Sequence, residues 1–215
     1  MSEVGSVLTR EEIKSRLHTS DASRKIFITP LLSEKQIGHA SIDVRLGNVF
    51  IVFRRTKYSG LDVLEEPAEK LVSRIGEFQE RVYIPLGQKL FLHPQQLVLG
   101  CTLEYIRLPN DLVAEVVGRS SWGRLGLILS AATLVHPGFA GVITLEMANQ
   151  DDVPIPLIPG LRVAQLVLNK TTIREENTSD IHKSRYFGAT EPSFSLLYED
   201  EELDGLKKIK DRSKQ

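Results

Sequence analysis

The chain has 215 residues, of which 41% are hydrophobic and 26% are charged, a balance typical of a folded globular domain. Its formal net charge of −1 excludes a broadly basic surface that would hold a nucleic-acid backbone, but it leaves room for a local cluster that binds a free nucleotide. The single cysteine, Cys101, excludes an intrachain disulfide and a cysteine-rich zinc site, and no apolar run approaches the roughly 20 residues of a membrane helix.

The predicted elements begin with one short helix near the N-terminus. Thr9 and Glu12 have the spacing of a capping box, and the helix should end near residues 18–21. Residues 54–69 are polar and predict a loop or an insertion. The remaining apolar runs are short and are separated by Gly, Pro, Asn and Asp, which predicts an all-β sandwich or barrel. The expected strands cover residues 26–28, 40–47, 49–53, 82–86, 89–92, 96–108, 112–117, 127–129, 141–149, 155–157 and 162–168.

The last part of the chain differs in composition. From about residue 171 the sequence turns polar, and residues 199–215 are highly charged. Such a tail is typically solvated or disordered, and a short helix around residues 203–209 is the alternative. We therefore predict one domain over residues 1–198, followed by a charged tail over residues 199–215.

The stretch from Gly118 to Gly126 lies between two expected strands and contains two arginines, two adjacent serines and three glycines. Glycine lets the backbone turn sharply, while serine hydroxyls and arginine guanidinium groups donate hydrogen bonds to phosphate oxygens. The stretch lacks the Gly-Lys-Ser/Thr ending of a Walker loop. Its composition fits a polyphosphate site and a surface turn with two solvated arginines equally well.

In the expected strand over residues 141–149, apolar side chains alternate with Thr144 and Glu146, so these two share the opposite face. A desolvated carboxylate acquires a raised pKa and then serves as a proton shuttle near neutral pH, whereas the alternative is a solvent-facing strand residue. His136 precedes it in a turn, as a hydrogen-bonding group or an exposed turn residue. The histidines have no metal-ligand spacing, so we expect no zinc.

Taken together, these motifs resemble the dCTP deaminase family, which shares its fold with the trimeric dUTPases. The resemblance extends over about residues 7–198, and several motifs occur in the expected order. The matching segments are residues 31–47, 118–126, 136–139, 141–149 and 159–166, with Tyr186, Gly188, Pro192 and Ser195 in a C-terminal closing segment.

This resemblance implies a distorted jelly-roll β fold that assembles as a homotrimer with active sites between subunits. It implies an enzyme that converts dCTP to dUTP and ammonia, with Mg²⁺ carried on the triphosphate and no metal bound by the protein. Glu146 would activate the water that attacks C4 of cytosine, and Ser120 and Arg124 would support it. The substrate-binding residues implied are Arg119, Ser120 and Ser121 at the triphosphate, Ala132 and Thr133 at the base and sugar, Gln165 at the phosphates, and Arg124, His136, Thr144 and Tyr186 elsewhere in the pocket.

The sequence departs from the family pattern in three places. His136 replaces the aspartate that bonds the sugar 3′-hydroxyl and, in the diphosphatases, activates water. Glu191 brings an acidic group to the closing segment, where the phosphates would be covered, and the loop over residues 124–136 is one residue short. Two alternatives therefore stay open: a dUTP diphosphatase or bifunctional enzyme, and a nucleotide-binding regulatory protein with altered catalysis. We expect a cytoplasmic protein that binds neither nucleic acid nor membrane.

Overall fold

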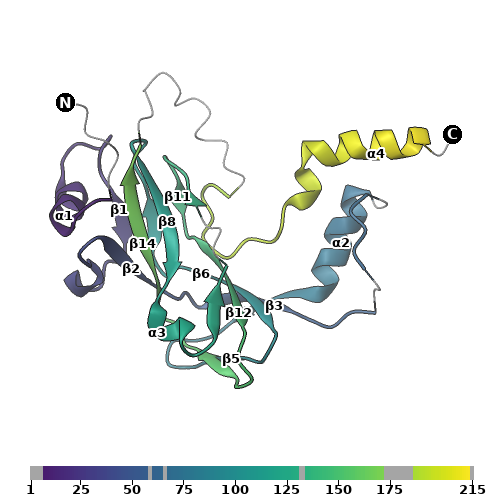
Figure 1. The fold of residues 1–215 in the computed structure, drawn as a ribbon, viewed down its shortest axis with the longest axis horizontal. Helices are drawn as coiled ribbons and strands as arrows, with labels where there is room; N and C mark the ends of the chain where they lie inside the picture. Colours follow the sequence, from purple (N-terminus) through teal and green to yellow (C-terminus); the bar gives the residue numbers. More distant parts are fainter. Residues whose placement is uncertain (1–6, 58–59, 65–66, 131–133, 172–185, 214–215) are drawn as a thin grey trace.

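The computed structural model describes residues 7–57, 60–64, 67–130, 134–171 and 186–213, and antiparallel β strands dominate it (Figure 1). The strands are β1 (Phe27–Thr29), β2 (Ser41–Arg45), β3 (Val49–Phe53), β4 (Gln79–Tyr83), β5 (Leu90–Leu92), β6 (Leu97–Cys101), β7 (Tyr105–Arg107), β8 (Leu112–Gly118), β9 (Leu127–Leu129), β10 (Leu134–Val135), β11 (Ala140–Gly141), β12 (Thr144–Asn149), β13 (Ile155–Leu157) and β14 (Arg162–Lys170). The all-β fold class predicted from the sequence is confirmed.

Two larger sheets organise the molecule. One has the strand order β4-β3-β6-β12-β9 and the other has the order β10-β8-β14-β2, while smaller sheets join β1-β7-β11 and β13-β5. A single buried cluster connects the larger sheets, with Phe50 from β3, Met147 from β12 and Leu166 from β14 all fully buried. Burying one such side chain contributes roughly 1.5–3 kcal/mol. Alternating burial along β12 and β14 therefore fixes which face of each strand is left for a site.

The N-terminal helix α1 (Arg10–His18) forms as predicted. The Thr9 backbone N–H donates to Glu12 Oε2 at 2.9 Å, and the Glu12 N–H donates to Thr9 Oγ1 at 3.4 Å, which completes the capping box. Ile13 is fully buried, so one face of the helix packs on the core. Arg16 also forms an ion pair with Asp111, which ties α1 to the start of β8.

The structure contains more helices than the N-terminal one that the sequence predicts with a capping box. The described residues also contain α2 (Ala68–Phe78), the short α3 (Ser120–Gly123), α4 (Glu201–Ser213) and two 3₁₀ helices, η1 (Glu34–Gln36) and η3 (Leu197–Glu199). The predicted polar loop therefore ends in a helix. Leu71 and Ile75 lie four residues apart on one face of α2 and are both buried, a helical spacing that the polar neighbours and Gly76 obscured.

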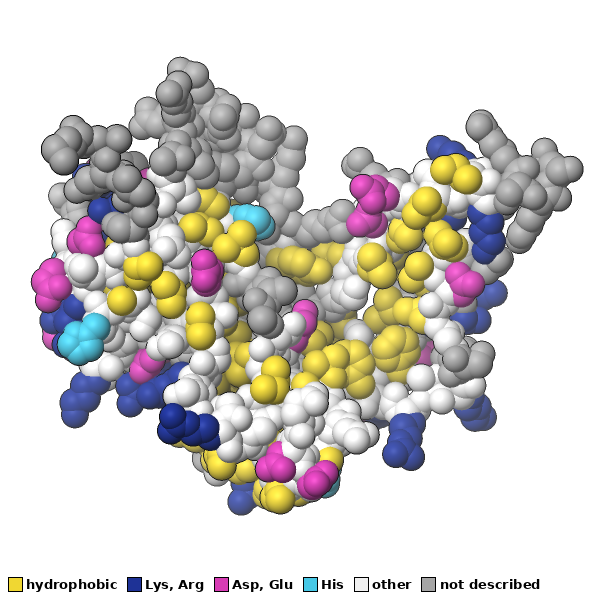
Figure 2. Space-filling view, viewed as in Figure 1, with side chains coloured by type: hydrophobic (Ala, Val, Ile, Leu, Met, Phe, Trp, Pro, Cys, Tyr) yellow, Lys and Arg dark blue, Asp and Glu magenta, His cyan; other side chains and the backbone are white. Residues whose placement is uncertain are grey.

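The charged tail is helical over Glu201–Ser213, so for these residues the helix alternative holds and the disordered alternative does not. Helix α4 extends beyond the predicted residues 203–209 at both ends. Figure 1 shows α2 and α4 together on one side of the sheets, at the end of the β3–β4 ribbon. In Figure 2, apolar side chains gather in the hollow between the sheets and these helices. None of the described helices is both long and apolar enough to cross a membrane.

Candidate active site

A cavity of about 650 Å³ opens beside Glu146. Its floor comes from β12 and β6, its rim from the turn that contains His136, and one wall from residues 186–195, which we term the closing segment. Phe53 and Gln79, at the base of the β3–β4 ribbon, complete it. The fold thus brings four predicted site residues to one cavity: His136, Thr144, Glu146 and Tyr186.

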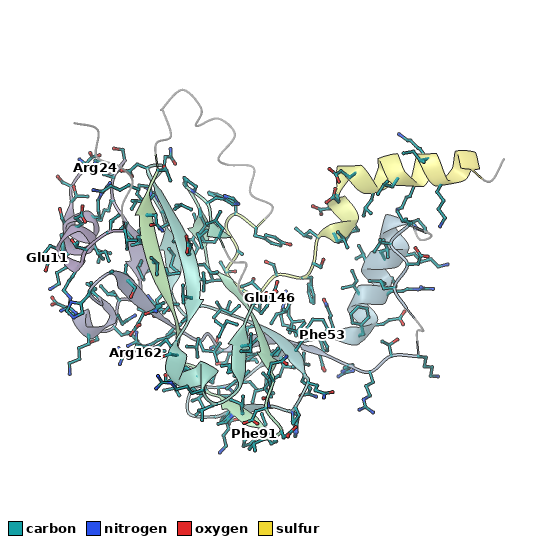
Figure 3. The ribbon with its side chains drawn as sticks, viewed as in Figure 1. Glu11, Arg24, Phe53, Phe91, Glu146 and Arg162 are labelled. Carbon is teal, nitrogen blue, oxygen red and sulfur yellow. The ribbon has the colours of Figure 1, made fainter. Side chains whose placement is uncertain are left out.

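Strand β12 holds Glu146 rigidly. It pairs with β6 on one side and with β9 on the other, and Glu146 lies opposite Leu99 in that register. Leu145 and Met147 are 1% and 0% exposed on the core side, so the predicted alternation of faces is confirmed. The Glu146 side chain is exposed in the single chain, as the solvent-facing interpretation expected, and it projects from the cavity side of β12 (Figure 3).

The closing segment is hydrogen-bonded along the edge that leads into β12. The Gly188 N–H donates to Ala140 O at 2.7 Å, and the Val142 N–H donates to Ala189 O at 2.8 Å. Gly141 has a φ of 150°, and a Cβ there would lie 3.1 Å from both the nitrogen and the oxygen of Ala189. Only glycine allows this close backbone approach without displacing the segment.

The arginine–serine stretch forms helix α3 between β8 and β9. The Arg119 backbone N–H donates to Val163 O at 3.0 Å, and Arg119 then caps α3 with its own carbonyl. Gly126 closes the turn with a φ of 85°, where a Cβ would lie 2.4 Å from Asp151 Cβ. Ser120, Ser121 and Arg124 are exposed, which suits both the phosphate-binding interpretation and the solvated turn.

Asp43 orients two arginines at this end of the four-stranded sheet. Its Oδ2 lies 3.6 Å from Arg119 NH1 and 3.0 Å from Arg162 NH1. Gln165 is the register partner of Asp43 and accepts a hydrogen bond from Ser41 Oγ at 3.2 Å. Arg119 and Gln165, both predicted to reach phosphates, are therefore neighbours. The sequence analysis missed Asp43 and Arg162, although an acidic residue at the polar face of an expected strand was a usable signal.

A single chain does not unite all the predicted site residues. Within the described residues, α3 contributes nothing to the cavity beside Glu146, so Ser120 and Arg124 are not brought to that carboxylate. Figure 3 shows Glu146 at the centre of the molecule and Arg162 at a different end of the sheets, toward α3. Ala132 and Thr133 lie outside the described residues.

A second glutamate, Glu104, is completely buried away from this cavity, and the sequence analysis did not identify it. Its Oε2 accepts from the Arg45 backbone N–H at 2.8 Å, and its Oε1 accepts from Gln36 Nε2 at 2.9 Å. Burial raises the pKa of this carboxyl above its ordinary value. The contacts join η1, β2 and the connection between β6 and β7, so we interpret Glu104 as a structural residue.

Two further observations concern cysteine and metal. Cys101 is 4% exposed, and burial raises the pKa of its thiol to about 12. Across the residues that the structure describes, no three His, Cys, Asp or Glu side chains are grouped so that they would hold a metal ion. The absence of zinc and the Mg²⁺ carried by substrate stay predictions.

Most of the sequence matches one known protein family and several curated proteins. A family described as dCTP deaminase-like matches residues 7–171. A "dCTP deaminase, dUMP-forming" of Methanobrevibacter smithii is 38% identical over 200 residues, which cover 92% of this chain and 98% of the relative. A "dCTP deaminase" of Natronomonas pharaonis is 35% identical, and the match covers 93% of this chain and 98% of the relative. A "dCTP deaminase, dUMP-forming" from Dictyoglomus turgidum is 41% identical, and the match covers 77% of this chain and 81% of the relative.

A solved structure gives the same fold. The crystal structure of 2′-deoxycytidine 5′-triphosphate deaminase from Agrobacterium tumefaciens matches with a TM-score of 0.56 and 22% sequence identity. The match covers 84% of this chain and 54% of that longer chain. At this identity the likeness supports the fold alone, and it agrees with the predicted jelly-roll class.

Proposed function

This chain belongs to the dCTP deaminase family, and from that premise we propose that it hydrolyses dCTP to dUTP and ammonia. One observation supports placing this reaction at the cavity described above: Glu146 projects from a central strand into that cavity of about 650 Å³. The cavity is large enough for a nucleoside, since ligand pockets typically measure roughly 300–1,000 Å³. The same cavity contains His136 and Tyr186, which the family resemblance also placed at the substrate.

Glu146 supplies the acid–base chemistry in this proposal. Its carboxylate takes a proton from water as the water oxygen bonds to C4 of cytosine, and it passes that proton to N3, where the electron pair of the C4=N3 double bond goes. The carboxylate then takes the proton of the new C4 hydroxyl and passes it to the amino nitrogen; the C4–N bond to the amino group breaks, ammonia leaves with the electron pair of that bond, and the C4=O bond of uracil forms. A carboxylate that relays these two protons in turn balances the reaction without a second base. Thr144, on the same face of β12, lines the cavity beside it.

The triphosphate would bind at the α3 end. Arg119 is held by Asp43 with its guanidinium partly exposed, so it keeps donors for phosphate oxygens. The hydroxyls of Ser120 and Ser121 are exposed nearby, and Gln165 lies on the adjacent strand. In this proposal Mg²⁺ arrives with the triphosphate and neutralises part of its charge, and the protein supplies no metal ligand.

We further propose that the functional unit is a cytoplasmic homotrimer. In one chain the exposed α3 residues and the Glu146 cavity are separate, so neither is a complete site. A cyclic trimer repeats one interface, in which α3 of each subunit can reach the cavity of its neighbour. Ser120 and Arg124 would then support Glu146 across the interface. Light scattering at micromolar concentration should give about three times the 24.1 kDa chain mass.

A second product is favoured by the names of several relatives. Those from Methanobrevibacter smithii and Dictyoglomus turgidum are named dUMP-forming. That reaction also releases pyrophosphate and needs a group that activates water at phosphorus. His136 occupies the cavity rim where the resemblance places an aspartate. We propose dUTP as the main product, because no carboxylate occupies that position.

One assay separates these functions. The purified protein is incubated with Mg²⁺ and either dCTP or dUTP, and ammonia, pyrophosphate and bound nucleotide are measured. Glu146→Gln should lower ammonia release by at least roughly 10²-fold, because glutamine cannot accept the proton. Glu115→Gln is the matched control, since Glu115 is also an exposed strand glutamate but lies on β8. Ammonia release that survives in Glu146→Gln would contradict the mechanism, and binding without either product would favour the regulatory alternative.

A further inference from the structure

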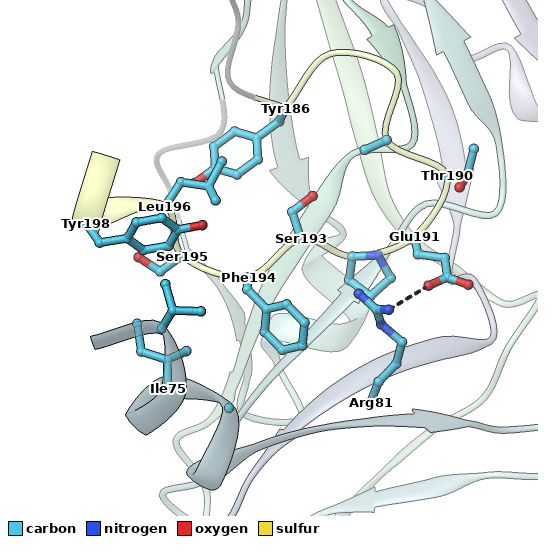
Figure 4. Close-up of a pocket in the computed structure, with 14 residues that line it drawn as sticks. Ile75, Arg81, Tyr186, Thr190, Glu191, Ser193, Phe194, Ser195, Leu196 and Tyr198 are labelled. Atoms are coloured by element: carbon cyan, nitrogen blue, oxygen red, sulfur yellow. Dashed lines mark ion pairs between the residues drawn. The ribbon is translucent and has the colours of Figure 1, made fainter. Parts of the chain in front are cut away.

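A second cavity, of about 510 Å³, lies on the other side of the closing segment, between that segment and α2 (Figure 4). Tyr186, Ser193, Phe194 and Ser195 line this second cavity and also the cavity beside Glu146. The closing segment is therefore a wall that both spaces share. Whatever fixes the segment on the α2 side also sets the shape of the cavity that contains Glu146.

Arg81 of β4 contacts this wall at two positions. Its NH1 lies 3.2 Å from Glu191 Oε2, and its guanidinium carbon lies 5.1 Å from the centre of the Phe194 ring. Figure 4 shows Arg81 reaching both side chains from the strand below. The ion pair and the attraction between a guanidinium and an aromatic face act on residues either side of Ser193.

Ser193 is held from the opposite direction by β12, the strand that carries Glu146. Its backbone N–H donates to Thr144 Oγ1 at 3.1 Å, and Thr144 lies two residues before Glu146 on the same face of β12. The closing segment is thus fixed between Arg81 and Thr144. Phe194, which Arg81 contacts, is itself a wall residue of the Glu146 cavity.

We propose that Arg81 is a positioning residue for the substrate cavity. By pairing with Glu191 and lying over Phe194, it keeps the closing segment in the place where that segment walls the cavity beside Glu146. Arg81 acts through the segment and does not itself line the Glu146 cavity. The proposal rests on the proposed function, because it assigns Arg81 a role in binding the same substrate.

The pairing also explains the acidic residue at position 191. From the sequence, Glu191 placed a negative charge where the segment would cover phosphates. In the structure its carboxylate faces Arg81, and the two side chains are each 46% exposed. Arg81 of β4 therefore balances the negative charge of Glu191. Glu191 serves as the attachment point of the segment rather than as a group directed at substrate.

The test compares Arg81→Ala, Glu191→Ala and Arg81→Lys with the wild type in dCTP deamination. Arg81→Ala removes an exposed ion pair and a cation–aromatic contact, which lowers the fraction of molecules in which the closing segment is in place beside the Glu146 cavity. The KM for dCTP should therefore rise roughly 3- to 10-fold. The value of kcat should stay within about twofold, because Glu146 is untouched. Glu191→Ala should raise KM in the same direction, and Arg81→Lys, which keeps the charge, should recover most of the loss.

Hydrogen exchange supplies a measurement that does not depend on catalysis. In Arg81→Ala the amides of residues 188–195, including the Ser193 N–H, should exchange faster than in the wild type. Arg54→Ala is the matched control, because Arg54 pairs with Glu80 on the same β3–β4 ribbon and does not line either cavity. It should change neither KM nor exchange in that segment.

The outcomes are distinguishable. Unchanged exchange in residues 188–195 of Arg81→Ala would overturn the positioning role, whether or not the enzyme is active. Faster exchange with an unchanged KM would also overturn it, because the wall would then not matter for substrate. A wild type that releases no ammonia from dCTP would defeat the proposed function, and the exchange experiment would still decide whether Arg81 holds the segment.

Discussion

Mixing two inactive variants tests whether each active site is built from two chains. Glu146→Gln removes the proposed base from the cavity, and Arg124→Ala removes a side chain of α3 that does not line the cavity of its own chain. If a neighbouring subunit supplies Arg124, each variant alone has no intact site. A mixed trimer, however, contains sites in which a normal Glu146 faces a normal Arg124.

The expected recovery follows from the proposed cyclic trimer. With equal amounts of the two variants and random assembly, a given cavity has a normal Glu146 in about half of cases, and its neighbour has a normal Arg124 in about half. About one quarter of all sites are then intact, so the mixture should recover about 25% of wild-type turnover. If Glu146 and Arg124 of the same chain formed one site, no mixture of these variants would contain an intact site.

The assay is ammonia release from dCTP after the two variants are unfolded together in urea and refolded, so that subunits exchange. Each variant refolded alone is the baseline, and refolded wild type sets the full activity. A mixture of Glu146→Gln with Glu146→Ala controls for effects of refolding, because neither chain supplies the base. Activity in the test mixture no higher than in that control would refute the shared site.

The remaining predictions concern binding, stability, reactivity and product. Arg119→Ala should weaken dCTP binding by roughly 1.5–3 kcal/mol, as for loss of a hydrogen bond to a charged group, and should affect deoxycytidine far less in titration calorimetry. Because burial raises the pKa of Glu104, its contribution to stability should be greatest below about pH 4.5 and decline as pH rises through the folded pKa; urea unfolding of Glu104→Gln should lack that decline. Cys101, with a thiol pKa of about 12, should resist a thiol reagent until the protein is unfolded. His136→Asp should keep ammonia release and add pyrophosphate release from dUTP, which product analysis would detect.

Local patterns predicted the strands and the first helix well, because each pattern has one dominant cause. The alternation of apolar and polar residues around Glu146 predicted which face of the strand packs on the core. The capping spacing of Thr9 and Glu12 predicted where α1 begins. The same reasoning failed over 96–108, expected as one strand. The structure divides it into β6 and β7, because the Thr102 hydroxyl bonds to Glu104 O at 2.8 Å and the Glu104 carboxyl turns inward. No periodicity in the sequence encodes such a contact.

The candidate site was predictable as a set of residues but not as an arrangement. Residue chemistry and family resemblance chose Glu146 and Arg119, yet only the structure shows that they lie at separate places in one chain. Asp43 is paired with both Arg119 and Arg162 through three strands, and the strand order β8-β14-β2 brings these residues together. Pairings of this kind depend on sheet topology, which a single sequence specifies only through long-range packing.

The two conspicuous departures from the family pattern have different structural consequences. His136 remains at the rim of the Glu146 cavity, so its replacement of an acidic residue changes the charge that the substrate meets. Glu191 is drawn to Arg81, so its charge is balanced before any substrate binds. The β12 strand that holds Glu146 is unaffected by either, since its core-side neighbours Leu145 and Met147 stay buried. The departures therefore alter the walls of the cavity and leave the position of the proposed base unchanged, which favours retained deamination over its loss.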